Sequence, residues 1–314
     1  MPITASFFAA IIPMLTYLIF IWRMDKYERE PLTFVFVHFI WGAIGAIALG
    51  IVGSFMLTDI SGVSEEYSGM LIQTVIFAPV AEEIAKGIFL LFTINSRRFD
   101  NLTDGLVYGG AIGLGFGMTE NFTYFISYGD TMIGWLFLVI IRSGFSAVMH
   151  CISTATFGAF LGVAKFTDSK YKAILPFIGL VLAIFYHFMW NLSVSFDETY
   201  LYGLLFMIVL ITMFVLVFKY SVEHEKRIIT KELYEESSFN IIPKEFIPII
   251  SSHLRLRKGW IDEAIRKQYF RTAIKLAFAK MKSKKARGYD QQYYLNEVDV
   301  NREILRSLTT MVNQ

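Results

Sequence analysis

The residues best suited to chemistry in this sequence are two adjacent glutamates and a lysine within an apolar segment. Glu82, Glu83 and Lys86 stand in the run 71–94, which is otherwise long and apolar. Charged side chains at membrane depth are costly, so they usually face a polar cavity or a partner. Glu82 and Lys86 are four residues apart on a helix and can pair, whereas Glu83 lies about 100° further round. Lys86 cannot easily neutralise both acids, so one carboxylate is left for another task.

Further polar side chains stand in other apolar segments. Glu120 follows Phe116 by four residues, His150 lies between Met and Cys, and His187 precedes Asn191 by four residues. The last spacing puts an imidazole and an amide on one helical face. Intramembrane ionisable groups are functional by default, and as a set these residues indicate a shared site rather than separate structural contacts.

These residue types are suited to hydrolysis of a peptide bond, which needs an activated water, a proton donor and a stabilised oxyanion. Either Glu83 or Glu82 could take the proton from water. His150 would orient that water, while His187 with Asn191 would face the developing oxyanion. The remaining groups have supporting roles, and the full set of catalytic candidates is Glu82, Glu83, Lys86, Glu120, His150, His187 and Asn191.

A metal site is the alternative use of the same residues, because two histidines and a glutamate are a common catalytic zinc set. The candidate ligands are Glu83, Glu120, His150 and His187. The sequence contains no His-Glu-x-x-His motif, which excludes the familiar zincin helix. We favour a metal-free glutamate mechanism with no cofactor, and keep zinc as the alternative.

In these motifs the chain resembles the PrsW family of intramembrane proteases, which is grouped with the CAAX endopeptidases and the ABI membrane proteins. The resemblance covers roughly residues 70–195. Where the CAAX endopeptidases typically carry a histidine in the second motif, this chain has Glu120, which argues against prenyl-protein processing. The resemblance implies a glutamate-type or metallo-type peptidase acting on a single-span membrane protein such as an anti-sigma factor. The motif positions are Glu82, Glu83 and Lys86, then Phe116 and Glu120, then His150, then His187 and Asn191.

The elements that must position these residues are membrane-spanning helices. The 314 residues are 55% hydrophobic and 18% charged, a composition typical of membrane proteins. Seven apolar runs approach the ~20 residues needed to cross a bilayer. The predicted fold is therefore all-α, a polytopic bundle of about seven transmembrane helices. The fifth run is long and contains Arg142, so it is expected to be kinked, tilted or broken. The runs are 4–22, 34–57, 71–94, 105–126, 132–164, 174–195 and 200–218.

Loop charge predicts the orientation of the bundle. Lys and Arg residues follow the first, third, fifth and seventh runs, whereas the alternate loops contain none. The positive-inside rule then places the N-terminus outside and the C-terminus in the cytoplasm. We expect an integral protein of a bacterial or archaeal plasma membrane.

The fourth run contains glycine at every fourth position from Gly105 to Gly117, which forms a smooth ridge for close approach of another helix. Glu120 extends the same face. The ridge alone is ordinary membrane packing, but a glutamate at its end is not.

The C-terminal part of the chain has a different composition, being polar and basic with helical periodicity at 261–281 and 301–311. We predict two domains: a protease-like transmembrane bundle over 1–219 and a small helical cytoplasmic domain over 220–314. A basic face is favoured near anionic lipid, so the expected partners are the bilayer and a membrane protein substrate. No motif resembles a nucleic-acid reader, and no nucleic-acid partner is expected.

The sequence therefore predicts an intramembrane endopeptidase. A non-enzymatic proton-coupled transporter or channel is the alternative from another class, because buried Glu, His and Lys also form proton relays. A transporter should contain inverted repeats with interrupted helices, and no such internal symmetry is evident.

Overall fold

The computed structural model describes residues 2–63, 66–99, 101–165, 167 and 170–312, and within these ranges it contains helices and no strands. The chain divides into two compact units. The first comprises Met1–Asp25 and Arg29–Phe218, and the second comprises Lys26–Glu28 and Lys219–Gln314. The boundary falls within one long helix, α10 (Tyr200–Ser237), close to the point where its composition changes from apolar to charged.

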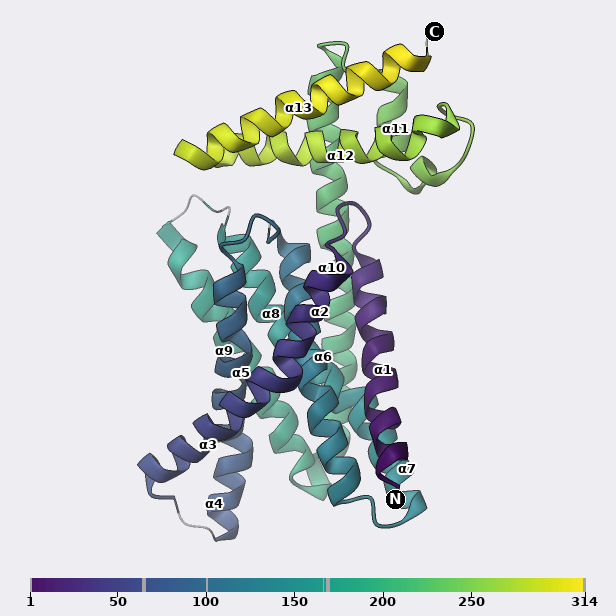
Figure 1. Cartoon of the computed structure of the whole chain (residues 1–314). Coiled ribbons are helices and arrows are strands. Elements are labelled where there is room, and N and C mark those ends of the chain that lie inside the picture. Colours follow the sequence, from purple (N-terminus) through teal and green to yellow (C-terminus); the bar gives the residue numbers. More distant parts are fainter. Residues whose placement is uncertain (1, 64–65, 100, 166, 168–169, 313–314) are drawn as a thin grey trace. The chain divides into compact units, whose positions relative to one another are not determined.

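The first unit is a bundle of long helices, three of which contain π-helical segments (Figure 1). The predicted polytopic helical bundle is confirmed. The helices, with the π-helical segments η1 to η3 in place, are α1 (Ile3–Met24), α2 (Leu32–Ile40), η1 (Trp41–Ala46), α3 (Ile47–Ser61), α4 (Tyr67–Ile72), η2 (Gln73–Phe77), α5 (Ala78–Thr93), α6 (Leu102–Ser127), α7 (Met132–Ile141), η3 (Arg142–Ser146), α8 (Ala147–Lys165) and α9 (Ile174–Val194).

Among the described residues, five helices are long and apolar enough to cross a membrane. They are Ile3–Met24, Leu32–Ser61, Met132–Lys165, Tyr171–Val194 and Asp197–Ser237. The two other predicted runs, 71–94 and 105–126, also lie in long helices but are not among these five. The first contains the charged residues of α5, and the second contains the many glycines of α6. The count of seven spans stays a prediction. The expected interruption of the fifth run is the π-helical segment η3, which begins at Arg142.

The glycine ridge of α6 allows close approach of another helix, as predicted, and that helix is α8. A Cβ added to Gly109 would overlap the carbonyl oxygen of Thr154, and one added to Gly113 would overlap that of His150. The two backbones are therefore in direct contact, which only glycine permits at these positions. This contact fixes the helix that carries His150 relative to the helix that carries Glu120. α6 begins with a capping box between Asn101 and Asp104.

The second unit has its own core, formed mainly by the packing of α12 (Glu263–Lys285) against α13 (Gly288–Val312) (Figure 1). The helical periodicity predicted for 261–281 and 301–311 corresponds to these two helices. Shorter elements precede them, namely η6 (Lys244–Phe246), α11 (Ile247–Ile250) and η7 (His253–Leu256). The fully buried Glu236 is paired with Arg302 at 2.8 Å and with Lys280 at 2.7 Å. Some of the basic residues of this unit are therefore neutralised internally. Its placement in the cytoplasm stays a prediction.

Candidate active site

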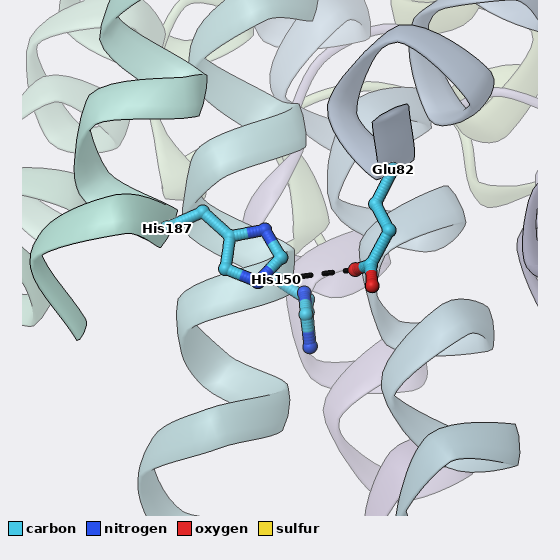
Figure 2. A group of neighbouring side chains, drawn as sticks. All are labelled: Glu82, His150 and His187. Carbon is cyan, nitrogen blue, oxygen red and sulfur yellow. Dashed lines mark ion pairs between the residues drawn. The ribbon is translucent and has the colours of Figure 1, made fainter. Parts of the chain in front are cut away.

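Four helices bring the predicted polar residues together inside the first unit. α5 contributes Glu82, Glu83 and Lys86, and the glycine-rich α6 contributes Glu120. α8 contributes His150 and α9 contributes His187. The side chains of Glu82, His150 and His187 point toward one another from three of these helices (Figure 2). Residues more than a hundred positions apart in the sequence thus share one cluster.

Glu83 is the most completely bonded carboxylate of the cluster. Its Oε1 accepts from Lys86 Nζ at 2.8 Å and lies 3.0 Å from His187 Nδ1. Its Oε2 accepts from the hydroxyl of Thr154 at 3.2 Å. Glu83, Lys86 and His187 are all buried. Glu83 is thus held in one orientation by a donor on its own helix and by donors on α8 and α9.

Thr154 is a contact that sequence reasoning missed. A threonine in an apolar helix is ordinary, and usually returns its hydroxyl to the carbonyl one turn earlier. The one available signal is its position four residues after His150, which puts both side chains on the same face of α8.

His150 connects α5 to α6 through its two ring nitrogens. Its Nδ1 lies 3.0 Å from Lys86 Nζ, and its Nε2 lies 2.7 Å from Glu120 Oε2. An ammonium can only donate, so Nδ1 must accept and the ring proton must be on Nε2, from which it is donated to Glu120. Glu120 is therefore the acceptor of the ring proton of His150. The Lys86 ammonium also lies 3.8 Å from the centre of the Phe116 ring.

Glu82 differs from its neighbour, because its Oε2 is buried and has no hydrogen-bond partner among the described residues. The closest cations or potential cations to this oxygen are Lys86 Nζ at 3.6 Å and His187 Nε2 at 3.8 Å. The sequence predicted that Lys86 would pair with one glutamate, and the closer partner is Glu83. The carboxylate left for another task is Glu82.

The cluster also contains a geometry suited to a metal ion. One ligand atom each from Glu82, His150 and His187 lies within 4.8 Å of the other two (Figure 2). The ligand set considered from the sequence contained Glu83 and Glu120 in place of Glu82. In the structure these two carboxylates instead accept hydrogen bonds from the histidines. Which of two adjacent glutamates faces a cavity depends on the rotation of its helix, which spacing alone does not define.

Asn191 is the one predicted catalytic residue that the structure keeps outside the cluster. Its Nδ2 donates to the carbonyl oxygen of Thr74 at 2.9 Å, in the π-helical segment η2. The amide therefore joins α9 to the helix that carries Glu82 and Glu83. This contact directs the Asn191 amide away from the cluster, and its expected task at the oxyanion stays a prediction.

The donor chemistry of the cluster fits a divalent metal such as zinc. Catalytic zinc sites use two histidines and a carboxylate and leave a position for water. The buried, unpartnered oxygen of Glu82 is the kind of atom that a cation would satisfy. Ligand histidines typically donate their second ring N–H to a carboxylate, and Glu83 and Glu120 accept in this way from His187 and His150.

The fold and the site together define a polytopic helical membrane protein with an acid–imidazole cluster between its helices. The sequence profile of the PrsW family, described as intramembrane metalloproteases, matches residues 30–218 of the chain. The chain belongs to the PrsW family, as its motifs predicted. It is therefore an intramembrane protease and an integral membrane protein, and this result favours the peptidase over the transporter alternative.

Curated relatives agree with this assignment. The chain is 29% identical over 167 residues to Protease PrsW of Clostridioides difficile (strain 630), which covers 53% of this chain and 68% of the relative. It is 29% identical over 184 residues to Protease PrsW of Oceanobacillus iheyensis, covering 58% and 80%. It is 25% identical over 201 residues to Protease PrsW of Bacillus subtilis (strain 168), covering 63% and 86%. No solved structure matches the chain.

Proposed function

We propose that the chain is a metal-dependent intramembrane endopeptidase in which Glu82, His150 and His187 hold a divalent ion, with zinc the natural choice for these donors. The observation that carries this proposal is the unpartnered Oε2 of Glu82, buried beside two imidazoles. The charge of the cluster supports it as well. The cluster contains three carboxylates, Glu82, Glu83 and Glu120, and two cations, Lys86 and Arg142. Its net charge is therefore −1 when both imidazoles are neutral.

The other residues would support this set. When bound, the metal supplies a Lewis acid that polarises the scissile carbonyl and lowers the pKa of a bound water. Glu83 would accept the proton of the attacking water, because it adjoins the ligand set without belonging to it. Lys86 and Thr154 orient Glu83, and Glu120 keeps the Nδ1 lone pair of His150 directed into the cluster.

The proposed substrate is a single-span membrane protein. A protease whose reactive groups lie between membrane helices encounters substrates that share the bilayer. The resemblance in the four motifs supports an anti-sigma factor as the substrate, whose cleavage would release a sigma factor. The expected setting is a bacterial or archaeal plasma membrane.

The metal-free glutamate mechanism is the second candidate, and one observation favours it. The ammonium of Lys86 already lies 3.0 Å from His150 Nδ1, where a metal ligand would need a free lone pair. In this mechanism Glu82 would act as the general base, since it is the glutamate with an unpartnered oxygen.

Two isosteric variants distinguish these mechanisms. The purified protein, reconstituted with a single-span substrate, would be assayed for cleavage and for bound metal by elemental analysis. In the metal mechanism Glu82→Gln loses both bound metal and cleavage, whereas Glu83→Gln retains metal and loses cleavage. A chelator abolishes wild-type cleavage, and zinc restores it. Cleavage that survives chelation in metal-free protein would contradict the metal mechanism and support the second candidate.

The proposed orientation is testable with cysteine labelling. The native Cys151 is buried, so its background reaction with a membrane-impermeant maleimide should be low. Ser61 ends α3, Tyr171 lies in the 3-10 helical segment Lys170–Ala173 that leads into α9, and both are exposed. Ser61→Cys should react in intact cells, whereas Tyr171→Cys should react only after lysis. Labelling of both positions from the same side would overturn the topology.

A further inference from the structure

Arg142 lies beside the cluster in a geometry that suggests a task in the reaction. Its Nη2 is 2.8 Å from Glu120 Oε2, the same oxygen that lies 2.7 Å from His150 Nε2. Its Nε donates to Asn121 Oδ1 at 3.2 Å, and the guanidinium carbon lies 3.5 Å from the centre of the Tyr124 ring. Three side chains of α6, at positions 120, 121 and 124, thus hold one arginine.

The π-helical segment explains how Arg142 reaches this place. Arg142 is the first residue of η3, which joins α7 to α8. On a regular α-helix, residues eight apart such as Arg142 and His150 point about 80° away from each other. A single π-helical turn inserts one residue and removes about 100° of that rotation, so the two side chains point in nearly the same direction. Both therefore reach Glu120.

We propose that Arg142 is a positioning residue for peptide-bond hydrolysis that acts through Glu120 on His150. The guanidinium fixes the position of Glu120 Oε2, which accepts the Nε2 proton of His150, while the Nδ1 lone pair of that ring is directed at Lys86 Nζ, 3.0 Å away. This inference rests on the proposed function, in which His150 takes part in hydrolysis. Arg142 is 11% exposed and Glu120 24% exposed, so water competes only partly for this pair.

The competing interpretation is that Arg142 only ties η3 to α6. If Arg142 is only a structural tie, its substitution lowers the stability of the fold. Activity then falls only in proportion to the amount of folded protein. A positioning residue instead lowers kcat in protein that remains folded, leaves KM unchanged and is coupled to Glu120. These outcomes differ in a double-mutant cycle.

The experiment compares Arg142→Gln, Arg142→Lys, Glu120→Gln and the double variant Arg142→Gln/Glu120→Gln in the reconstituted cleavage assay, with thermal unfolding of each. Loss of a group that orients a ligand histidine typically costs about 10- to 100-fold. We expect kcat to fall by about that factor in Arg142→Gln and in Glu120→Gln. The double variant should fall no further than the worse single variant, and Arg142→Lys should recover part of the loss. Fully multiplicative losses, or a kcat within twofold of wild type in folded Arg142→Gln, would overturn the proposal.

A second readout does not depend on activity. The chain has five histidines, so ¹⁵N spectra of histidine-labelled protein can be assigned to His150 by comparison with His150→Gln. Wild type should show the Nε2-protonated tautomer, which the Lys86 ammonium beside Nδ1 requires, with the Nε2–H proton shifted downfield by its hydrogen bond to Glu120. In Arg142→Gln, where the guanidinium no longer holds Glu120, that proton should move upfield. An unchanged Nε2–H resonance in Arg142→Gln would contradict the proposed role. If wild type proves inactive while this resonance shifts, the proposed function fails, whereas the positioning of Glu120 and His150 by Arg142 stands.

Discussion

The backbone contact between α6 and α8 at Gly113 gives a sharp test of how the site is built. In Gly113→Ala the new methyl group would overlap the carbonyl oxygen of His150 and lie 2.7 Å from the Cα of Cys151. Favourable carbon–carbon contacts lie near 3.5–4.0 Å, so the two backbones must separate by about 1 Å. Overpacking of this kind costs about 1–3 kcal/mol.

The matched control is Gly144→Ala. A Cβ at Gly144 meets nothing within 4 Å, and this glycine is also helical. Both substitutions gain roughly the same helix propensity, up to ~1 kcal/mol, so the difference between them isolates the steric cost. We expect Gly113→Ala to unfold at a lower temperature than Gly144→Ala in the same detergent.

The same displacement should also affect catalysis, because the overlapping carbonyl belongs to His150. A misplacement of about 1 Å in a catalytic group can cost ~100-fold in rate. Cleavage by the folded fraction of Gly113→Ala should fall by up to that factor, and cleavage by Gly144→Ala should stay near wild type. If the two variants have the same melting temperature and the same rate, the close contact of α6 with α8 does not position His150.

Three further predictions concern single side chains. Thr154→Val removes a hydroxyl donor to Glu83 at nearly constant shape and should destabilise the protein by about 1.5–3 kcal/mol, measured by thermal unfolding. Asn191→Ala should reduce cleavage far less than substitution of Glu83, because its amide bonds to Thr74 outside the cluster; equal losses in a kcat comparison would contradict this placement. Burial raises the pKa of Tyr269 to about 12. An exposed tyrosine titrates near 10, so the neutral phenol stabilises the fold below about pH 10 and this contribution, about 2–3 kcal/mol, is lost as the pH rises to about 12. Tyr269→Phe should flatten that alkaline fall in melting temperature.

Much of the architecture could be predicted from the sequence, because membrane helices must be long, apolar and internally hydrogen-bonded. The predicted run 71–94 corresponds to a helix that ends at Thr93. The ridge from Gly105 to Gly117 allows the close approach of another helix, as its spacing indicated, and that helix is α8. The sequence groups Glu120 with His150 because both are ionisable residues in apolar runs, and the structure places them 2.7 Å apart.

The misplaced parts of the site depend on helix rotation, which periodicity does not define. Asn191 shares a face with His187, but one turn along α9 that face meets the carbonyl of Thr74 rather than the cluster. The sequence indicated an interruption of the fifth run but not its kind, and the π-helical turn that begins at Arg142 brings Arg142 and His150 to the same carboxylate, Glu120. Neither contact can be derived from a helix treated as regular and isolated.

The tandem glutamates are best explained as a division of tasks between two carboxylates that a helix holds about 100° apart. Glu83 receives donors from Lys86, His187 and Thr154, so its position is fixed and its charge compensated. Glu82 keeps a buried oxygen without a hydrogen-bond partner among the described residues, and its closest cation is Lys86 Nζ at 3.6 Å. Leaving a buried polar group without a hydrogen bond costs about 1–3 kcal/mol. In the proposed mechanism this open oxygen binds the metal ion and the fixed carboxylate of Glu83 accepts a proton, so the adjacent pair lets α5 supply both from one turn of helix.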